Sequence, residues 1–180
     1  MEVVLQSVAS KLDNDTICHL ANDISKEFQN VATVSVGSTF ALQTDPQFQS
    51  AFDTKRNQWY SPKLLVCFFE QFRPNKDTKI LFILDVDAYS DGLNYVLGEA
   101  YPKGRLGIIY LPRIRQEFYG LKPDIELFYE RMVKESVHEL GHAFGFVHCQ
   151  NPLCVMHFSN SLADTDTKAR SFCSSCKKIF

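Results

Sequence analysis

The sequence lacks several features that would assign it to other classes of protein. Its formal charge is only −2 over 180 residues, with both signs scattered along the chain. It has no basic stripe of the kind that binds nucleic acid. Apolar runs stay well short of the roughly 18 residues of a membrane helix, and we find no internal repeat or low-complexity linker. We therefore expect no nucleic acid and no membrane among its partners.

The N-terminal segment also lacks the features of a secretion signal. It begins with an acidic residue, Glu2, and its apolar run breaks at Gln6 and Ser7. A signal peptide has a basic start followed by a longer apolar stretch. We therefore expect a cytoplasmic protein, in a reducing compartment where clustered cysteines hold metal more often than they form disulfides.

Apolar side chains are plentiful, because hydrophobic residues make up 45% of the chain and 15 of them are Phe. Such a composition can bury a sizeable core and argues against disorder. The length predicts a single domain spanning residues 1–180. After Gly145 the sequence changes to loops, cysteines and polar residues. We therefore expect an upper lobe over residues 1–146 and a small C-terminal lobe over residues 147–180.

The hydrophobic pattern predicts strands that alternate with helices. Apolar residues recur between residues 13 and 28 at the spacing of an amphipathic helix. Ser61 followed by Pro62 is typical of a helix start, and the near-continuous apolar run 79–86 is typical of a central strand buried on both faces. The expected order is strand 2–8, helix 13–28, strand 31–36, helix 61–72, strand 79–86, strand 105–111 and helix 124–145. This order predicts an α/β fold, although residues 40–60 show no clear period.

One segment, HELGHAFGFVH, begins at His138 and contains three of the five histidines of the chain. On a helix, His138 and His142 project from one face and can share a metal ion. Glu139 is rotated about 100° from His138, a position poorly suited to ligation and well suited to a base acting on water at the metal. Gly145 can adopt the left-handed conformation that ends a helix. The chain can then turn back and supply His148 as a third ligand.

Three neutral imidazoles leave the fourth tetrahedral position of a zinc ion open to water, as a catalytic site requires. The alternative interpretation is that these are ordinary half-buried histidines. If His, Glu and Gly each occur at a few per cent, chance places all five fixed residues on the order of once in 10⁵ such chains. The extended motif therefore predicts a catalytic zinc ion held by His138, His142 and His148.

Four of the six cysteines lie close to the C-terminus. They form two pairs, Cys149-x₄-Cys154 and Cys173-x₂-Cys176, which can close tetrahedrally on one zinc ion. A structural zinc would supply stability that a short lobe with few apolar residues lacks. Disulfides are the alternative interpretation. The other two cysteines are expected to be small, buried apolar residues in helices: Cys18 and Cys67.

These residues resemble the metzincin metallopeptidases, which share the extended zinc motif and a later methionine in a tight turn beneath the metal. Met156, eight residues after His148, fits this role, in which its thioether packs as a floor and does not bind the metal. With the cysteines around it, the segment from Ser136 to Cys176 resembles the archaemetzincins, a metzincin branch with a second, four-cysteine zinc site. Upstream, the order of strands and the segment 93–98 give looser support.

The resemblance implies a metzincin-like α/β fold. It has a twisted, mostly parallel sheet, backing helices, an active-site helix and a small zinc-stapled C-terminal lobe. The resemblance also implies two zinc ions per chain and a peptide or protein substrate, with strand 105–111 at the upper rim of the cleft, where an extended peptide could pair with its edge. Some metzincins carry a tyrosine two residues after the methionine. Phe158 stands there in this chain, which excludes a tyrosine-assisted step from that position, and the neighbouring His157 is a candidate for a supporting role.

The expected activity is that of a zinc metallopeptidase. Zinc lowers the pKa of a bound water toward about 7, and Glu139 would take a proton from that water and pass it to the leaving amine. One alternative is a zinc-dependent hydrolase of a non-peptide amide, such as a deacylase, which the motif does not distinguish from a peptidase. The other is a catalytically silent, zinc-stabilised binding module. The sequence opposes it, because such a module has no use for Glu139 or for an open metal position.

Overall fold

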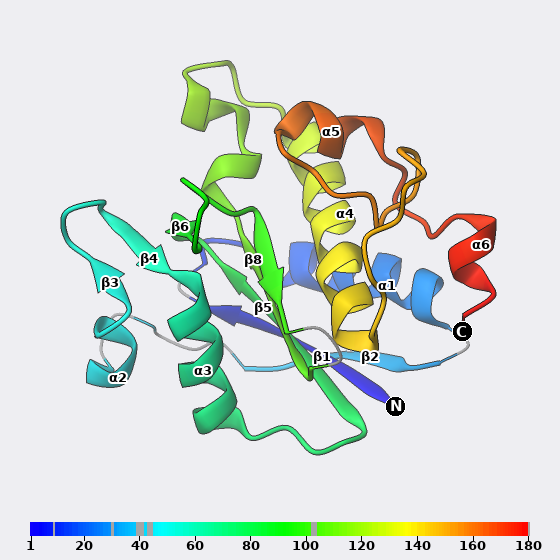
Figure 1. Cartoon of the computed structure of the whole chain (residues 1–180), viewed down its shortest axis with the longest axis horizontal. Helices are drawn as coiled ribbons and strands as arrows, with labels where there is room; N and C mark the ends of the chain where they lie inside the picture. Colours follow the sequence, from blue (N-terminus) through cyan, green and yellow to red (C-terminus); the bar gives the residue numbers. More distant parts are fainter. Residues whose placement is uncertain (9, 30, 39–41, 43–44, 102–103, 180) are drawn as a thin grey trace.

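The computed structural model describes residues 1–8, 10–29, 31–38, 42, 45–101 and 104–179. A twisted five-stranded sheet in the order β2-β1-β5-β8-β7 forms its centre (Figure 1). Four strands run parallel, and β7 alone is antiparallel to its neighbour β8. The bounds are β1 (Glu2–Val8), β2 (Thr33–Val36), β5 (Thr78–Leu84), β7 (Gly98–Ala100) and β8 (Leu106–Tyr110). The predicted α/β fold with a mostly parallel sheet is confirmed.

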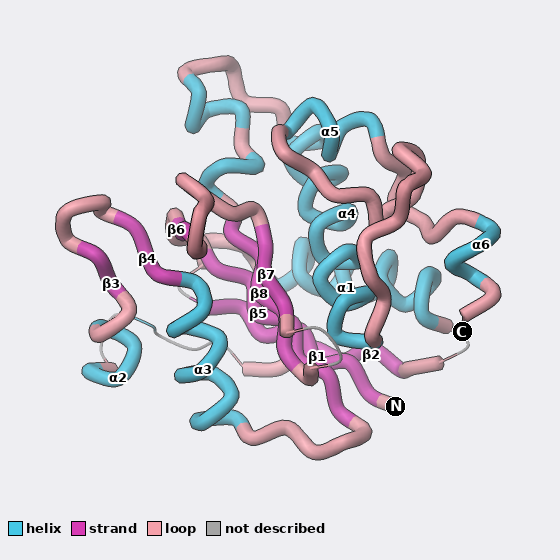
Figure 2. Tube along the Cα trace, in the orientation of Figure 1, coloured by secondary structure: helices cyan, strands magenta, loops and turns pink. Residues whose placement is uncertain are grey.

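Helices cover both faces of this sheet, as Figures 1 and 2 show. Helices α1 (Asn14–Phe28) and α4 (Ile125–Phe144) pack on one face, and α3 (Ser61–Phe72) packs on the other. Successive residues of a strand point to opposite faces, so in β5 Leu81 joins the core with α1 and α4, whereas Phe82 joins the core with α3. Because both faces are covered, β5 is buried almost throughout, as its apolar run predicts.

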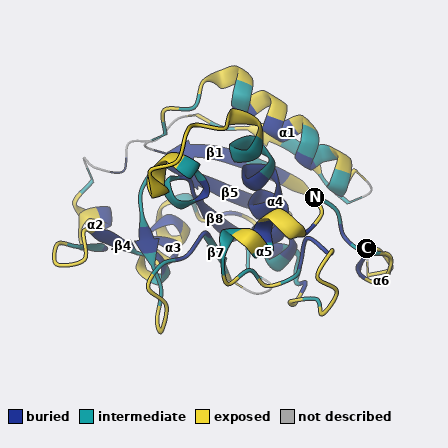
Figure 3. Ribbon diagram, turned by 90° about the horizontal axis from the view of Figure 1, so that it is seen from above, coloured by how far each residue is buried: buried dark blue, intermediate teal, exposed yellow. Residues whose placement is uncertain are grey.

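Helix α1 forms where its apolar stripe predicts. The Asp13 side chain caps it by accepting a hydrogen bond from the Thr16 amide at 2.7 Å. Its apolar stripe faces the sheet and α4, and its other face is exposed to solvent (Figure 3). At its end, the Phe28 ring stacks on Phe144 of α4 with the ring centroids 5.0 Å apart. This contact places the C-terminal end of α4 against α1.

Helix α3 begins one residue earlier than a Ser61 cap implies. The N-cap is Tyr60, and Ser61 is the first helical residue. The Ser61 hydroxyl lies in the core, where it accepts a hydrogen bond from the Tyr110 hydroxyl of β8 at 2.7 Å. A buried hydroxyl of tyrosine needs such a partner, and this tertiary contact takes the place of a local cap.

Several short elements were not predicted. A second, three-stranded sheet consists of β3 (Phe52–Asp53), β4 (Gln58–Tyr60) and β6 (Ala88–Tyr89). The short helices are α2 (Pro46–Gln49), η2 (Pro112–Ile114), η3 (Gln116–Tyr119), α5 (Leu162–Thr167) and α6 (Ser174–Lys177). Each is too short to show a hydrophobic period. Residues 40–41 and 43–44, which showed no period in the sequence, lie outside the described residues.

The predicted position of strand 105–111 is wrong. It corresponds to β8, which lies inside the sheet between β5 and β7, so β7 forms the edge of the sheet beside α4. The sequence did not show β7, because only three of its residues pair with β8. Within the described part of the chain, no helix combines the length and the apolar character needed to span a bilayer.

Candidate active site

The candidate site begins on α4, the long helix predicted from residues 124–145. The Asp124 side chain caps its start by accepting from the Leu127 amide at 2.9 Å. Gly145 ends it in a left-handed conformation (φ 99°), and the Phe146 amide donates to the Gly141 carbonyl at 2.9 Å. These bonds are typical of a glycine-terminated helix. They turn the chain back so that His148 approaches the last turn of the helix.

The structure brings the three histidines of the motif together. The Nε2 atoms of His138 and His142 are 3.1 Å apart, and those of His142 and His148 are 3.2 Å apart. For zinc–nitrogen bonds of about 2.0–2.1 Å, the edge of a tetrahedron is about 3.3–3.4 Å. Three nitrogens this close therefore surround a point that could hold a zinc ion. We call these three residues the histidine site.

Hydrogen bonds fix the rings of the two helical histidines. Nδ1 of His138 lies 2.7 Å from the Val155 carbonyl oxygen, and Nδ1 of His142 lies 2.8 Å from that of Phe146. A carbonyl can only accept, so Nδ1 must carry the proton, and Nε2 keeps its lone pair for a metal. Burial lowers the pKa of both imidazoles, that of His138 well below its usual value. The neutral, ligating form is thus favoured.

Glu139 lies beside the histidines but is turned toward the sheet. Its side chain is buried against Gly98 of the edge strand β7. Burial raises the pKa of its carboxyl group well above the usual value, the charge of Glu135 adds to this rise, and the charge of Lys168 opposes it. A general base benefits from a pKa raised toward the working pH. The environment of Glu139 therefore suits proton transfer.

A pocket of about 480 Å³ opens over these residues. Helix α4 lines one side with His138, Glu139 and His142, His148 lies beside it, and the segment 92–100, which includes β7, lines another side. The third side is formed by residues 158–160 and Lys168, which follow the motif in the chain. The Tyr95 hydroxyl donates to the Asn160 carbonyl at 3.4 Å and so connects two of these sides.

The four C-terminal cysteines also come together, and we call them the cysteine cluster. Sγ of Cys149 lies 3.8 Å from that of Cys173, and Sγ of Cys154 lies 3.8 Å from that of Cys176. All four sulfur atoms lie within 4.8 Å of one another. For zinc–sulfur bonds of about 2.3 Å, the edge of a tetrahedron is about 3.8 Å, whereas a disulfide requires about 2.05 Å. The spacing fits a zinc ion and does not fit disulfides.

The environment of the cysteine cluster favours a thiolate at one position. Hydrogen bonds from backbone amides, led by that of Cys176, lower the pKa of Cys173 to about 6, whereas burial raises that of Cys154.

Outside the cluster, Cys67 is buried as expected, but Cys18 is exposed, so its predicted burial is wrong. Cys18 follows Ile17 of the apolar stripe of α1, but it lies about 100° further around the helix, where it is exposed.

Met156 and its neighbours pack against α4 and His148, next to the histidine site. Met156 is fully buried, and its sulfur lies so close to Gly141 of α4 that a side chain there would collide with it. The Phe158 ring packs on His148 with the centroids 4.9 Å apart. Nδ1 of His157 bonds to the Cys149 carbonyl at 2.9 Å. His157 thus lies between the two candidate metal sites and holds the backbone that joins them.

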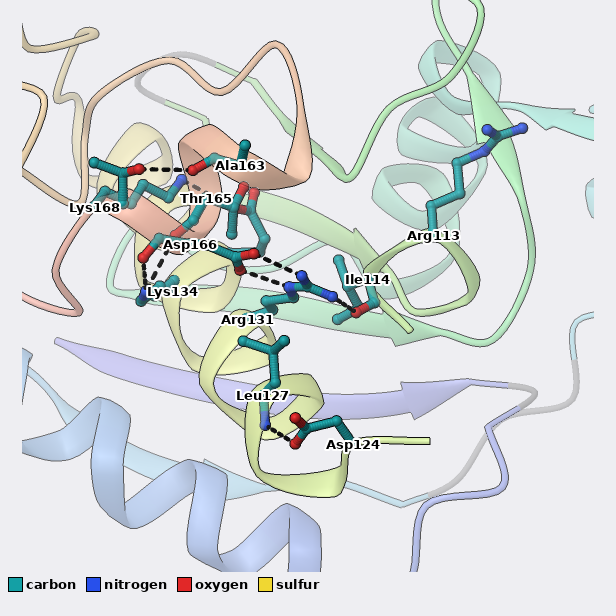
Figure 4. Close-up of polar contacts among 12 residues, drawn as sticks. Arg113, Ile114, Asp124, Leu127, Arg131, Lys134, Ala163, Thr165, Asp166 and Lys168 are labelled. Atoms are coloured by element: carbon teal, nitrogen blue, oxygen red, sulfur yellow. Dashed lines mark hydrogen bonds and ion pairs between the residues drawn. The ribbon is translucent and has the colours of Figure 1, made fainter. Parts of the chain in front are cut away.

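Sequence analysis missed a polar cluster between α4 and α5, part of which Figure 4 shows. The Glu135 carboxylate pairs with Lys168 at 2.9 Å and accepts from the Thr165 hydroxyl at 3.0 Å. Arg131 forms two bonds of 2.6 Å to Asp166. Glu135 precedes His138 by three residues, so helical spacing could have placed it on the same face. No local signal marks Lys168, because its pairing depends on the tertiary fold.

Comparisons with known proteins agree with this geometry. The model of "Peptidase family M54" matches residues 40–180. The archaemetzincin of Pyrococcus furiosus is 44% identical over 129 residues, which cover 72% of this chain and 67% of that protein.

Two crystal structures match nearly the whole chain. The archaemetzincin of Archaeoglobus fulgidus, complexed with malonate, superposes with a TM-score of 0.79 at 32% identity, covering 100% of both chains. A zinc-dependent peptidase of Methanocorpusculum labreanum superposes with a TM-score of 0.81 at 27% identity, covering 97% of this chain and 98% of that one. These matches confirm the resemblance predicted from residues 136–176 and favour a peptidase over both alternatives. The chain belongs to peptidase family M54, the archaemetzincins, and is a zinc metallopeptidase.

Proposed function

We propose that this metallopeptidase hydrolyses peptide bonds with a catalytic zinc ion held by the histidine site and with Glu139 as the general base. One observation carries the proposal. Three Nε2 atoms converge on the wall of a pocket, with those of His138 and His148 at 3.1 and 3.2 Å from that of His142, and a buried carboxylate lies on the helix that carries two of them. The pocket of about 480 Å³ is large enough for several atoms on either side of a peptide bond.

When bound, zinc supplies Lewis acidity, which acidifies a coordinated water and polarises the substrate carbonyl. The residues of the chain perform the proton transfers. Glu139 accepts a proton from the water whose oxygen attacks the carbonyl carbon. It then donates that proton to the amide nitrogen as the carbon–nitrogen bond breaks, which leaves a carboxylic acid and an amine. The low polarity around Glu139 favours the first of these transfers, because burial disfavours its charged form and so makes it a stronger base.

We also propose a second, structural zinc ion in the cysteine cluster, so that each chain holds two. Four thiolates complete a tetrahedron and leave no position for water, which suits a structural and not a catalytic site. The 3.8 Å spacing of the sulfur atoms supports this assignment. The cluster adjoins the turn at Met156, since the Cys149 amide donates to the Met156 carbonyl at 2.9 Å. A metal there would fix the floor of the catalytic site.

Replacement of Glu139 tests the proposed role most directly. Glu139→Ala should keep both zinc ions and the fold, but its hydrolytic rate should fall at least about 10²-fold. This is the lower end of what general acid–base catalysis contributes. Glu126→Ala is a matched control, because Glu126 is an exposed carboxylate in the first turn of the same helix. Rates would be measured on a peptide selected from a library with the wild-type enzyme, and zinc by elemental analysis.

The outcomes separate the proposal from its alternatives. A Glu139→Ala enzyme that is loaded with zinc and cleaves the selected peptide at the wild-type rate would show that Glu139 is not the base. Acylated amines of small size should be poor substrates. If they were cleaved and peptides were not, the substrate assignment would be wrong while the site assignment would remain.

A further inference from the structure

Gly98, at the start of the edge strand β7, lies directly against the side chain of Glu139. A Cβ atom built on Gly98 would be 2.5 Å from Oε1, 2.7 Å from Cγ and 2.8 Å from Cδ of Glu139. Carbon atoms in contact normally stay about 3.5–4.0 Å apart. The carboxylate therefore occupies the space that any other residue at position 98 would fill with its own side chain.

The backbone does not require glycine at this position. Gly98 pairs with Ile109 of β8 in a regular antiparallel register, and its φ lies outside the left-handed region that favours glycine. Alanine could adopt the same extended conformation without backbone strain. The absent Cβ thus leaves space for the Glu139 side chain, but it is not needed for the backbone conformation of the strand.

A second glycine, Gly107 of β8, contacts a different part of Glu139, near the backbone of α4. A Cβ on Gly107 of β8 would approach the Cβ of Glu139 at 3.1 Å, its carbonyl oxygen at 3.4 Å and Leu81 at 3.3 Å. A side chain at position 107 would therefore meet the backbone of α4, whereas the three atoms nearest to a Cβ on Gly98 all belong to the Glu139 side chain beyond its Cβ. The two positions differ in the part of Glu139 that they contact.

We propose that Gly98 is a positioning residue for catalysis: its missing side chain determines where the Glu139 carboxylate lies relative to the histidine site. This inference rests on the proposed role of Glu139 as the base. A methyl group at position 98 displaces a flexible side chain and leaves the backbone in place, so the fold tolerates it. Catalysis does not, because a misplacement of about 1 Å can cost about 10²-fold in rate.

The experiment is a double-mutant cycle between positions 98 and 139. Gly98→Ala should lower kcat by about 10-fold to 10²-fold, with zinc content and unfolding temperature near those of the wild type. In a Glu139→Ala background, the same change should lower the residual rate no further, because the displaced carboxylate is gone. Non-additivity of this kind identifies two residues that act through each other.

Gly107→Ala is the matched control. It meets the Cβ and the backbone of Glu139, atoms that Glu139→Ala retains, and it also meets Leu81. Its effect should therefore fall on the unfolding temperature and should be the same in both backgrounds. Only Gly98→Ala should show an effect that depends on the Glu139 carboxylate.

Three results would overturn the proposal. An unchanged kcat in Gly98→Ala would show that the carboxylate position does not depend on this contact. An equal loss in the wild-type and Glu139→Ala backgrounds, with KM raised, would show that the methyl group blocks substrate in the pocket. Loss of zinc or unfolding of Gly98→Ala would assign Gly98 a structural role. If Glu139→Ala alone kept the wild-type rate, the proposed function would fail first, and independently of Gly98.

Discussion

The histidine site and the cysteine cluster lie next to each other in the chain, but they are built differently. Two of the three histidines project from one rigid helix, and backbone carbonyls orient their rings. The cysteines come from the loop 149–154 and from the start of the short helix α6, and their sulfur atoms lie close to one another and to the Cys173 amide. The first site should therefore be formed before metal binds, whereas the second should depend on its metal for its shape.

The two sites also differ in their access to solvent. His148 is exposed at the pocket, and three nitrogens would leave one tetrahedral position of a zinc ion open. Cys154 and Cys176 are buried, and four sulfur atoms would complete the tetrahedron of a zinc ion. Openness here therefore comes from the number of donors and from the pocket wall, since the donor atoms of each set all lie within 4.8 Å of one another.

The largest expected effect is on activity, from removal of one ligand of the open site. His142→Ala should reduce peptide hydrolysis to background and lose one zinc ion, because two imidazoles hold the metal far less tightly than three. The zinc of the cysteine cluster should stay. Elemental analysis that found both zinc ions in the His142→Ala protein would show that His142 is not a ligand. His19→Ala is the control, because His19 is exposed on α1.

The next largest effect is on stability, from removal of one ligand of the closed site. Cys154→Ser should lose the structural zinc and lower the unfolding temperature by on the order of 10 °C, since metal binding in such sites contributes folding free energy. The exposed Cys18 offers a control, because Cys18→Ser should change neither zinc content nor unfolding temperature. An unfolding temperature equal to that of the wild type in Cys154→Ser would contradict the structural role.

A smaller effect should appear as a pH dependence of the metal-free protein. Burial lowers the pKa of all three histidines of the open site below 6.5. Below pH 6.5 these histidines therefore bind protons more readily in the unfolded chain than in the folded chain, so their contribution to the free energy of unfolding falls as the pH falls. Urea unfolding of chelated protein at pH 7.5 and pH 5.5 measures this fall.

Replacement of the most strongly shifted histidine identifies the source of this pH dependence. His138→Gln should reduce the fall in stability, whereas His19→Gln should not, because His19 is exposed on α1. An equal fall in both variants would assign it to other groups.

The smallest effect concerns the floor shared by both sites. Met156→Leu should keep both zinc ions and cost less than about 1.5 kcal/mol of stability, because the exchange nearly conserves volume. The branched leucine should fit less well against Gly141, where the unbranched thioether now lies, so the rate should fall only a few-fold. A complete loss of zinc in this variant would indicate that Met156 binds the metal.

The sequence predicted those parts of the fold whose signals are local and repeated. The 3.6-residue stripe of α1, the apolar run of β5 and the caps of α4 depend on neighbouring residues, so they can be found without knowledge of the fold. The edge strand β7 was missed, because three residues carry no period and its pairing with β8 is a tertiary contact. The predicted start of α3 differs from the observed one for the same reason, since the Ser61 hydroxyl accepts a tertiary hydrogen bond from Tyr110 and does not cap the helix.

For the candidate site, the sequence by itself determined which donors could meet. The spacing of His138 and His142 on a helix, and the glycine that returns His148, follow from the helical turn. Only the tertiary structure decided how these donors are oriented and what surrounds them. The carbonyl that holds His138, the Lys168 partner of Glu135 and the space that Gly98 leaves for Glu139 all join residues distant in sequence. Such contacts arise from the packing of α4 between the sheet and the C-terminal segment, which no local pattern encodes.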